Sequence, residues 1–371
     1  MKELADDSFD SIVTDPPYGI NFMGKEWDGP QGMVGQMATG DEQRGAYAYG
    51  GSHSRGYADN DNVLFQQWCE TWLTESLRVL KPGGHLLAFG ATRTFHRLTC
   101  AAEDAGFEIR DAIFWCYGSG FPKSMNVGKA IDKAAGATRE VVETIPDRWA
   151  GKGSVLARSN QEPAGTVDIT TPATPEAHQW QGWGTALKPA VEPIVVARKS
   201  LSEKTVAKNV LKHGTGGINI DGTRVGEADG FGGGAKGTSG FAAGYASEGF
   251  AVTGKGRWPA NLILSDDDPA EWAKFFHNFP LVYQPKANKK ERPVVDGQRH
   301  PTVKPLALMR NLVRLVTPPG GVVLDPFAGS GTTVEACVLE GFQCHAIERE
   351  PGYLPFIHHR VDRVQSTVGS K

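Results

Sequence analysis

The chain has 371 residues, 40% of them hydrophobic, which is enough to bury a large core as one elaborated domain or as two. No apolar run approaches the length of a membrane span, and the acidic start MKELADDSFD lacks the regions of a signal peptide. We therefore expect a soluble, cytoplasmic protein without a membrane partner. The net charge of −3 excludes a protein that coats nucleic acid through bulk charge.

The cysteine and histidine patterns argue against a metal site. The five cysteines are odd in number and contain no CxxC pair, which also disfavours a disulfide framework. The ten histidines form no HExxH motif and no clustered ligand set. We expect reduced thiols and no metal ion.

Strand and helix signals alternate over the first third of the chain. Residues 9–14 and 85–89 have the pattern of buried strands, and 61–80 carry apolar side chains at helical spacing. A helix around 93–105 and a strand at 109–117 follow. This alternation predicts an α/β fold in which helices cover a mostly parallel sheet.

The middle of the chain is less regular. The segment 29–60 is rich in Gly, Tyr, Asn and Ser, and we expect it to form a flap over a site. Residues 191–197 predict a strand and 200–213 a helix. The Gly-rich segment 214–256 contains spaced aromatic residues, which suit an anchored loop or a nucleic-acid surface.

Two segments carry local positive charge. Residues 188–212 and 285–304 each contain six Lys or Arg against two Asp or Glu, a net charge of +4. Such segments can bind a polyanion or simply form solvated surface.

Regular signals return near the C-terminus. A helix over about 304–316 precedes a strand at 321–325, a helix at about 330–340 and a strand at 344–348. A final helix occupies much of 351–363. Strand, glycine turn, helix and strand together predict a βαβ unit.

The glycine turn at 329–331 has the features of a cofactor site. Gly329 and Gly331 let the backbone approach a ligand, and the helix that follows presents free N–H groups. A P-loop needs a Lys after its last glycine, and a dinucleotide fingerprint needs a glycine where this chain has Val334. Both phosphate-binding interpretations are therefore weakened.

Two carboxylates follow the predicted strands of this unit. Glu348 can accept hydrogen bonds from both ribose hydroxyls of an adenosine, and Asp325 is placed for a cofactor's amino-acid end. A site that has carboxylates but no residues to bind a phosphate is suited to a positively charged sulfonium nucleoside.

Near the N-terminus, Asp15, Pro16, Pro17 and Tyr18 follow the first strand. An exocyclic base amine is a poor nucleophile, because its lone pair is delocalised into the ring. The Asp15 carboxylate and the Pro16 carbonyl can accept its two N–H groups, Pro17 fixes the turn, and the Tyr18 ring can stack on the base. In a duplex the base must first be flipped out.

The order of three motifs resembles the beta-class DNA amino-methyltransferases (the N6-adenine and N4-cytosine methylases), in which the catalytic half precedes the cofactor half. The motifs are Asp15-Pro-Pro-Tyr18, His300-Pro-Thr-Val-Lys-Pro305 and Asp325-Pro-Phe-Ala-Gly-Ser-Gly-Thr-Thr333. Residues 78–84 and 191–196 match as well. The resemblance covers about 5–125, 186–200 and 298–363.

The resemblance implies a Rossmann-like, S-adenosylmethionine-dependent methyltransferase fold with circularly permuted motifs and a reversed last strand. It also implies that His300, Thr302 and Lys304 approach the carboxylate end of S-adenosylmethionine. The remaining cofactor-binding residues expected are Asp325, Phe327, Gly329, Ser330, Gly331, Thr332 and Glu348.

The expected organisation has a catalytic half and a cofactor-binding half separated by inserts. The catalytic half is 1–126, a core strand occupies 187–199, the cofactor half is 299–371, and the variable segments 127–186 and 200–298 are candidates for target recognition.

The expected activity is methylation of adenine N6 in double-stranded DNA, since Asp15 rather than Ser resembles the adenine enzymes. Methylation of cytosine N4 is the alternative. Two more distant alternatives are methylation of RNA or of a protein glutamine, and a DNA-binding relative without catalytic activity. No nuclease motif is evident, so a restriction endonuclease would be a separate chain. A role as a stand-alone or phage modification enzyme fits the sequence equally well. The protein could also form a homodimer.

Overall fold

The computed structural model describes most of the chain. The described residues are 1–20, 28–29, 33, 59–117, 124–146, 165–224, 258–265, 282–283, 287, 291–295 and 297–368. The chain divides into two compact units, one of residues 1–118 and 191–371 and one of residues 119–190. Within the described ranges, no helix combines the length and the hydropathy needed to cross a bilayer.

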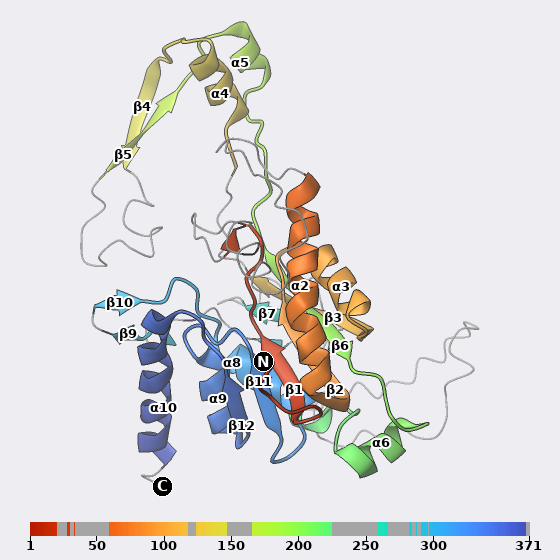
Figure 1. The fold of residues 1–371 in the computed structure, drawn as a ribbon. Helices are drawn as coiled ribbons and strands as arrows, with labels where there is room; N and C mark the ends of the chain where they lie inside the picture. Colours follow the sequence, from red (N-terminus) through yellow and green to blue (C-terminus); the bar gives the residue numbers. More distant parts are fainter. Residues whose placement is uncertain are drawn as a thin grey trace, which may run out of the picture. The chain divides into compact units, whose positions relative to one another are not determined.

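An eight-stranded sheet forms the centre of the larger unit (Figure 1). Its strands are β1 (Phe9–Thr14), β2 (Leu80–Phe89), β3 (Glu108–Tyr117), β6 (Val191–Arg198), β7 (Leu262–Ser265), β8 (Val282–Tyr283), β11 (Val322–Asp325) and β12 (Gln343–Ala346). They lie in the order β12-β11-β1-β2-β6-β3-β7-β8. Only β6 runs antiparallel to its neighbours, and the other pairs are parallel.

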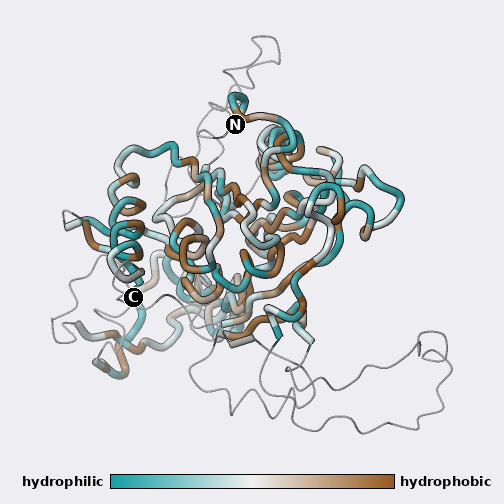
Figure 2. Tube along the Cα trace, turned by 90° about the horizontal axis from the view of Figure 1, so that it is seen from below, coloured by the Kyte–Doolittle hydropathy of each residue, from teal (hydrophilic) through white to brown (hydrophobic). Residues whose placement is uncertain are grey.

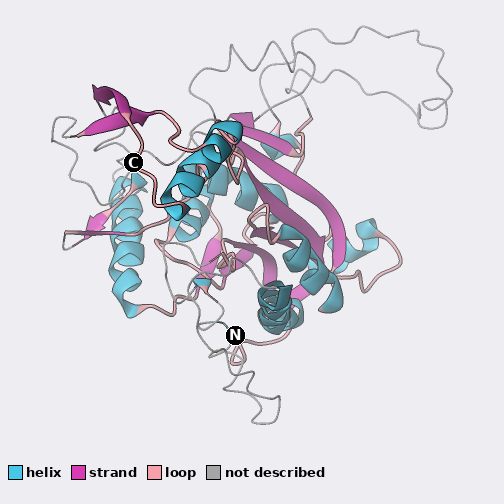
Figure 3. Cartoon of the chain, turned by 90° about the horizontal axis from the view of Figure 1, so that it is seen from above, coloured by secondary structure: helices cyan, strands magenta, loops and turns pink. Residues whose placement is uncertain are grey.

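Helices cover the sheet (Figure 3). They are α2 (Asp59–Val79), α3 (Phe95–Asp104), α6 (Val206–His213), α8 (Leu306–Val316), α9 (Thr332–Glu340) and α10 (Leu354–Val368), with short 3₁₀ turns η3 (Asp221–Thr223) and η5 (Pro351–Tyr353). A small antiparallel pair, β9 (Val294–Val295) and β10 (Gln298–Arg299), precedes α8. In Figure 2 many of the hydrophobic stretches of the chain, in brown, lie in the interior of the trace.

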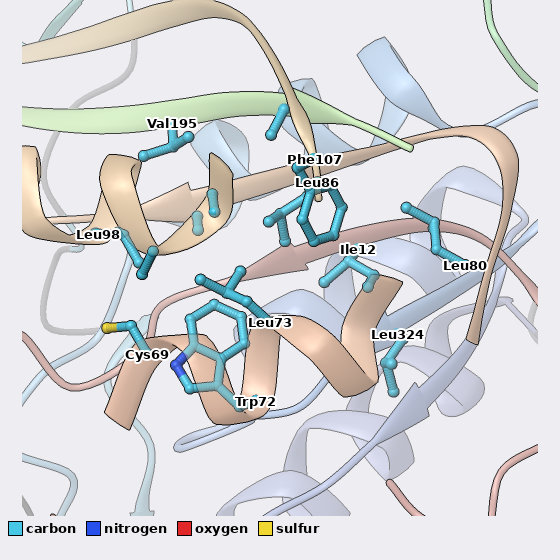
Figure 4. Packing of buried hydrophobic residues seen from close by; sticks show 14 of the residues in the cluster. Ile12, Cys69, Trp72, Leu73, Leu80, Leu86, Leu98, Phe107, Val195 and Leu324 are labelled. Atoms are coloured by element: carbon cyan, nitrogen blue, oxygen red, sulfur yellow. The ribbon is translucent and has the colours of Figure 1, made fainter. Parts of the chain in front are cut away.

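Two hydrophobic cores lie on opposite faces of the sheet, because successive strand residues point to opposite sides. Ile12 packs with the α2 and α3 side chains, and its neighbour Val13 packs with those of α8 and α9. Figure 4 shows Trp72 and Leu73 of α2 beside Ile12 and Leu324. The two layers of helices hold the strand ends, and hence the turns that follow them, in fixed positions.

In its described residues, 124–146 and 165–190, the smaller unit has two helices and a two-stranded ribbon. Its elements are α4 (Val127–Ala134), β4 (Val141–Pro146), β5 (Thr166–Thr170) and α5 (Pro175–Gln179). The buried Asp132 carboxylate accepts backbone N–H bonds from Ala173 and Thr174 at 3.1 and 3.0 Å and pairs with Arg139 at 3.3 Å. This one side chain joins α4 to the segment before α5.

The predicted α/β fold is confirmed, including the mostly parallel sheet with one antiparallel strand. The reversed strand is β6, which lies between β2 and β3 and is therefore neither the last strand in the chain nor an edge of the sheet. The predicted helix at 200–213 begins only at Val206, where Thr205 caps it, and ends at Gly214 as expected.

Two segments differ from the sequence-based expectation. The candidate recognition segment 127–186, for which no helix or strand was predicted, contains α4, β4, β5 and α5. The strands β7 and β8 fall inside 200–298, so this segment contributes to the sheet as well as to any recognition surface. Most of 29–60 and of 214–256 lies outside the described residues.

Candidate functional site

The two predicted turns lie side by side, although they are far apart in the chain. β1 and β11 are parallel neighbours, with Ile12 opposite Leu324. The hydroxyl of Thr14 donates to the carboxylate of Asp325 at 2.7 Å. Parallel strands end at the same edge of a sheet, and sites of open α/β folds are built there.

A cavity of about 410 Å³ opens at this edge. Its walls include Asp15, Pro17, His300, Thr302, Lys304, Asp325, Phe327, Gly329, Ser330, Thr332 and Glu348, all of them predicted site residues. Pro16, Tyr18 and Gly331 are not part of the lining. The volume is in the range typical of small-molecule sites.

The cavity also has aromatic walls that the sequence did not reveal. Trp68 and Trp72 of α2 line it, and their ring centroids lie 5.7 and 5.3 Å from that of Phe327. Tyr353 lines it as well and packs on His300 with centroids 4.3 Å apart. In the sequence the two tryptophans have the ordinary spacing of a core helix face, which concealed this role.

The glycine turn at the start of α9 is tightly constrained. Gly329 and Gly331 have φ values of +51° and +78°, a region that disfavours other residues. A Cβ on Gly331 would lie 3.0 Å from Cα of Ile357. The positive φ values favour glycine at both positions, and the close approach of Ile357 requires it at Gly331.

Glu348 holds this turn in place. Its Oε2 accepts the N–H of Gly329 at 2.7 Å, and its Oε1 accepts the N–H of Glu350 at 2.7 Å. The residue lies just beyond the end of β12, close to the predicted strand end. Its carboxylate is therefore fixed at the cavity wall.

Asp325 is almost fully buried, with 1% of its surface exposed. Burial raises the pKa of its carboxyl from the ordinary value of 3.8 to about 6, and hydrogen bonds from Thr333, Thr14 and the Phe327 N–H limit the rise. The carboxylate is thus charged at neutral pH in an enclosed place, where it can attract a cation.

His300 is neutral at physiological pH. Burial lowers the pKa of its imidazole to about 4. Its Nδ1 donates to the carbonyl of Thr302, and the ring borders Gly329. The neutral ring and Thr302 form one wall of the cavity.

Lys304 lines the cavity and also contacts the catalytic turn. Its ammonium donates to Asp15 Oδ2 at 2.7 Å, to the Tyr18 hydroxyl at 3.0 Å and to Glu192 Oε2 at 3.2 Å. Burial lowers the pKa of Lys304, but the Asp15 and Glu192 carboxylates outweigh it and raise the pKa overall. The residue joins the cofactor half to the catalytic turn as an ammonium ion.

Tyr18 is held at both its backbone and its hydroxyl. Its N–H donates to Asp28 at 2.6 Å, and its carbonyl accepts from Thr94 at 2.7 Å. Its hydroxyl lies 2.8 Å from Asp15 Oδ1 and 3.2 Å from Glu192 Oε2. Burial, followed by the charges of these carboxylates, raises the pKa of Tyr18 well above its usual value, so the phenol stays neutral.

Asp28 and Glu192 are site residues that sequence reasoning missed. Asp28 accepts two backbone N–H bonds of the catalytic turn, from Tyr18 and from Gly19. Glu192 is the second residue of β6, beside a proline, in a segment that matched the family in the sequence. An acidic residue at the start of an otherwise apolar strand was the available signal.

The first basic segment, 188–212, is partly neutralised. Arg198 pairs with Glu108 at 2.6 Å, and Lys212 pairs with Glu203 at 2.6 Å. Lys199 pairs with Asp7 at 2.7 Å. In 285–304, Lys304 lies in the site, and Lys286, Lys289 and Lys290 lie outside the described residues. Across the part of the chain that the structure describes, no three His, Cys, Asp or Glu side chains are grouped to hold a metal ion.

Comparisons with known proteins show the family of the chain. A family model described as DNA methylase matches residues 9–358. The type II methyltransferase M.HindIII of Haemophilus influenzae is 25% identical over 345 residues, which cover 91% of this chain and 83% of that protein.

Two solved structures illustrate the similarity of fold. The M1.HpyAVI–SAM complex is 15% identical with a TM-score of 0.42, over 97% of this chain and 90% of that one. The cytosine-N4-specific PvuII DNA methyltransferase is 14% identical with a TM-score of 0.45, over 97% of this chain and 81% of that one.

Proposed function

The chain belongs to the DNA methylase family, whose methyl donor is S-adenosylmethionine, and we propose that it methylates N6 of adenine in duplex DNA. The observation that carries this proposal is the shared cavity. Asp15 and Pro17 of the catalytic turn line the same space as Asp325, Phe327 and Glu348. A target amine at the first turn and a cofactor at the second would therefore meet.

The cavity has the chemistry that S-adenosylmethionine needs. The aromatic side chains of Trp72 and Phe327 offer flat apolar walls for an adenine ring. The Glu348 carboxylate can accept ribose hydroxyls, and the buried Asp325 carboxylate can attract the cofactor's ammonium group. When bound, the cofactor supplies an electrophilic methyl group.

The chain's own residues would prepare the amine. Asp15 and the Pro16 carbonyl accept its two N–H groups and turn its lone pair toward the cavity, while Tyr18 stacks on the flipped base. As the nitrogen–methyl bond forms, the sulfur–methyl bond breaks and its electron pair stays on sulfur. The nitrogen then loses one proton, and Asp15 is the acceptor in this proposal.

Adenine N6 is favoured over cytosine N4 by one residue. The first position of the catalytic turn is Asp15, as in the adenine enzymes that the motif resembles, whereas the cytosine enzymes more often have Ser. Both amines need two acceptors of the same kind, so cytosine N4 is the second candidate. Identification of the methylated nucleoside separates them.

Reading of the DNA sequence is assigned to the inserts at 127–186 and 200–298. The unit 119–190 contains the antiparallel ribbon β4–β5. A two-stranded ribbon is one of the elements that the DNA major groove admits. Methylome sequencing of cells that express the protein would identify the target sequence.

The experiment is transfer of a labelled methyl group from S-adenosylmethionine to unmethylated duplex DNA. The protein should label DNA, and Asp15→Ala should lose at least about 100-fold in rate, since preorganised acceptors supply much of such catalysis. An Asp15→Ala protein with full activity contradicts the mechanism. A protein that fails to bind S-adenosylmethionine in calorimetry would instead be an inactive relative.

A further inference from the structure

Four side chains around the catalytic turn form one charged cluster. Asp15 and Tyr18 come from the turn after β1, Glu192 is the second residue of β6, and Lys304 precedes α8. The Lys304 ammonium has three N–H donors, and its three contacts with Asp15, Tyr18 and Glu192 use all of them. It also lies 4.7 Å from the centre of the Phe89 ring.

The reversed direction of β6 brings Glu192 to this place. Parallel strands direct their carboxyl ends to the site, and an antiparallel strand directs its first residues there. Glu192 accordingly lies opposite Trp115, near the end of β3. Its Oε2 lies near both Lys304 and the Tyr18 hydroxyl, and its carboxylate also accepts a hydrogen bond from Tyr117.

The cluster carries a net charge of −1, from two carboxylates and one ammonium. Methyl transfer moves positive charge from sulfur to the target amine. An ammonium 2.7 Å from Asp15 would oppose this build-up of charge and cancel the attraction of the Asp15 carboxylate. A second carboxylate on the same ammonium removes that opposition.

We propose that Glu192 is a positioning residue that neutralises Lys304, so that the negative charge of Asp15 remains uncompensated at the target amine. Lys304 then orients Asp15 and the Tyr18 hydroxyl without an electrostatic cost to the reaction. The assignment rests on the proposed methyl transfer and extends it to a residue outside the catalytic turn. It acts on the rate of transfer rather than on cofactor binding, because Glu192 does not line the cofactor cavity.

The test uses single-turnover transfer of labelled methyl groups to duplex DNA, with S-adenosylmethionine affinity measured by calorimetry. Glu192→Gln should slow transfer about 10- to 100-fold, the effect of one unit charge acting over roughly 6–12 Å at an effective dielectric constant of about 20. Its Kd for S-adenosylmethionine should stay within about threefold of that of the unsubstituted protein.

A double variant separates charge from structure. The double variant Glu192→Gln, Lys304→Met removes both charges and leaves Asp15 as the only charged residue of the cluster. It should therefore transfer methyl groups faster than the single variant Glu192→Gln. A purely structural role of Glu192 predicts that the second substitution makes the loss greater. Glu192→Asp keeps the charge and should retain most of the unsubstituted rate, a result that tests the proposal even if Glu192→Gln does not fold.

Glu108→Gln is the matched control. Glu108 is an ion-paired glutamate at the opposite end of β3, where it contacts Arg198, and its loss should leave the rate unchanged. An unchanged rate in Glu192→Gln, or a double variant as slow as Glu192→Gln, overturns the inference while the methyl transfer stands. No transfer by the unsubstituted protein overturns the proposed function and this inference with it.

Discussion

The hydroxyl of Thr14 donates a 2.7 Å hydrogen bond to Asp325, and so joins the last residue of β1 to the last residue of β11. The next residue after Thr14 is the catalytic Asp15 of our proposal, and Asp325 opens the cofactor turn. The two halves of the site come from opposite ends of the chain, and this contact sets their spacing at one edge of the sheet.

Asp325 should make cofactor binding depend on pH. Its carboxyl has a pKa of about 6, so binding of S-adenosylmethionine should weaken as pH falls through 6, when the carboxylate is protonated. Asp325→Asn should bind more weakly at pH 8 and lose this dependence. Calorimetry between pH 5 and 8 measures both, and equal pH profiles for the two proteins would rule out Asp325 as the titrating group.

The Asp325 carboxyl should also make the free energy of unfolding depend on pH, but stability should fall as pH rises, whereas cofactor binding should strengthen. Its pKa is higher in the folded chain than the ordinary 3.8, so the folded state holds the proton between about pH 4 and 6. The stability contribution is present below pH 4 and lost as pH rises through 6. In urea unfolding, the free energy of unfolding of Asp325→Asn should therefore rise relative to that of the unsubstituted protein between pH 4 and pH 7.

Tyr18 offers two separable contributions, its ring and its hydroxyl. Tyr18→Ala should lose about 10- to 100-fold in single-turnover rate, because base stacking on an aromatic ring contributes about 1–3 kcal/mol. Tyr18→Phe keeps the ring and loses only the hydroxyl contacts with Asp15, Glu192 and Lys304. It should retain far more activity, and equal losses in the two variants would assign the effect to the hydroxyl.

Glu348 should be important for cofactor affinity. Gln at this position leaves one acceptor oxygen for two backbone N–H groups, those of Gly329 and Glu350. Glu348→Gln should weaken S-adenosylmethionine binding about tenfold, the effect of losing a hydrogen bond to a charged group. Calorimetry checks this against Glu103→Gln on the exposed side of α3, which should bind like the unsubstituted protein.

A buried ion pair outside the site should contribute strongly to the stability of the fold. Arg360 has no exposed surface, and its guanidinium donates to Glu335, which also pairs with Arg363. Glu335→Gln leaves the buried charge of Arg360 without its partner and should lower the free energy of unfolding by about 3 kcal/mol.

Glu340, on the same helix, provides the control for this change. It pairs with Arg310 and Arg314, whose side chains are 40% and 34% exposed, so Glu340→Gln should cost less than about 1 kcal/mol. Urea unfolding compares the two variants, and a similar loss in both would contradict the importance of burial.

The larger unit was predictable because its strands are short, apolar and bounded by turns. β1, β3 and β11 lie where the sequence placed them, and the helix face of α2 was visible in its spacing. The ribbon β4–β5 was missed because its strands are short and their side chains are almost all exposed, so neither strand has a buried apolar face. Each strand pairs with the other, and the sequence of one strand does not identify its partner.

The site was predictable to the extent that it lies on motifs. Asp15, Asp325 and Glu348 were found because each follows a recognisable strand. The place of Lys304 was not, since its partners Asp15 and Glu192 are distant in the chain and meet only through the order of the strands. Glu192 was missed because its role depends on the reversed direction of β6.

The central claim is that this site methylates adenine N6. The most direct measurement is mass spectrometry of the nucleosides released from duplex DNA after incubation with the protein and isotope-labelled S-adenosylmethionine. The account predicts labelled N6-methyl-2′-deoxyadenosine, which disappears with Asp15→Ala. Labelled N4-methyl-2′-deoxycytidine, or no labelled nucleoside at all, would contradict it.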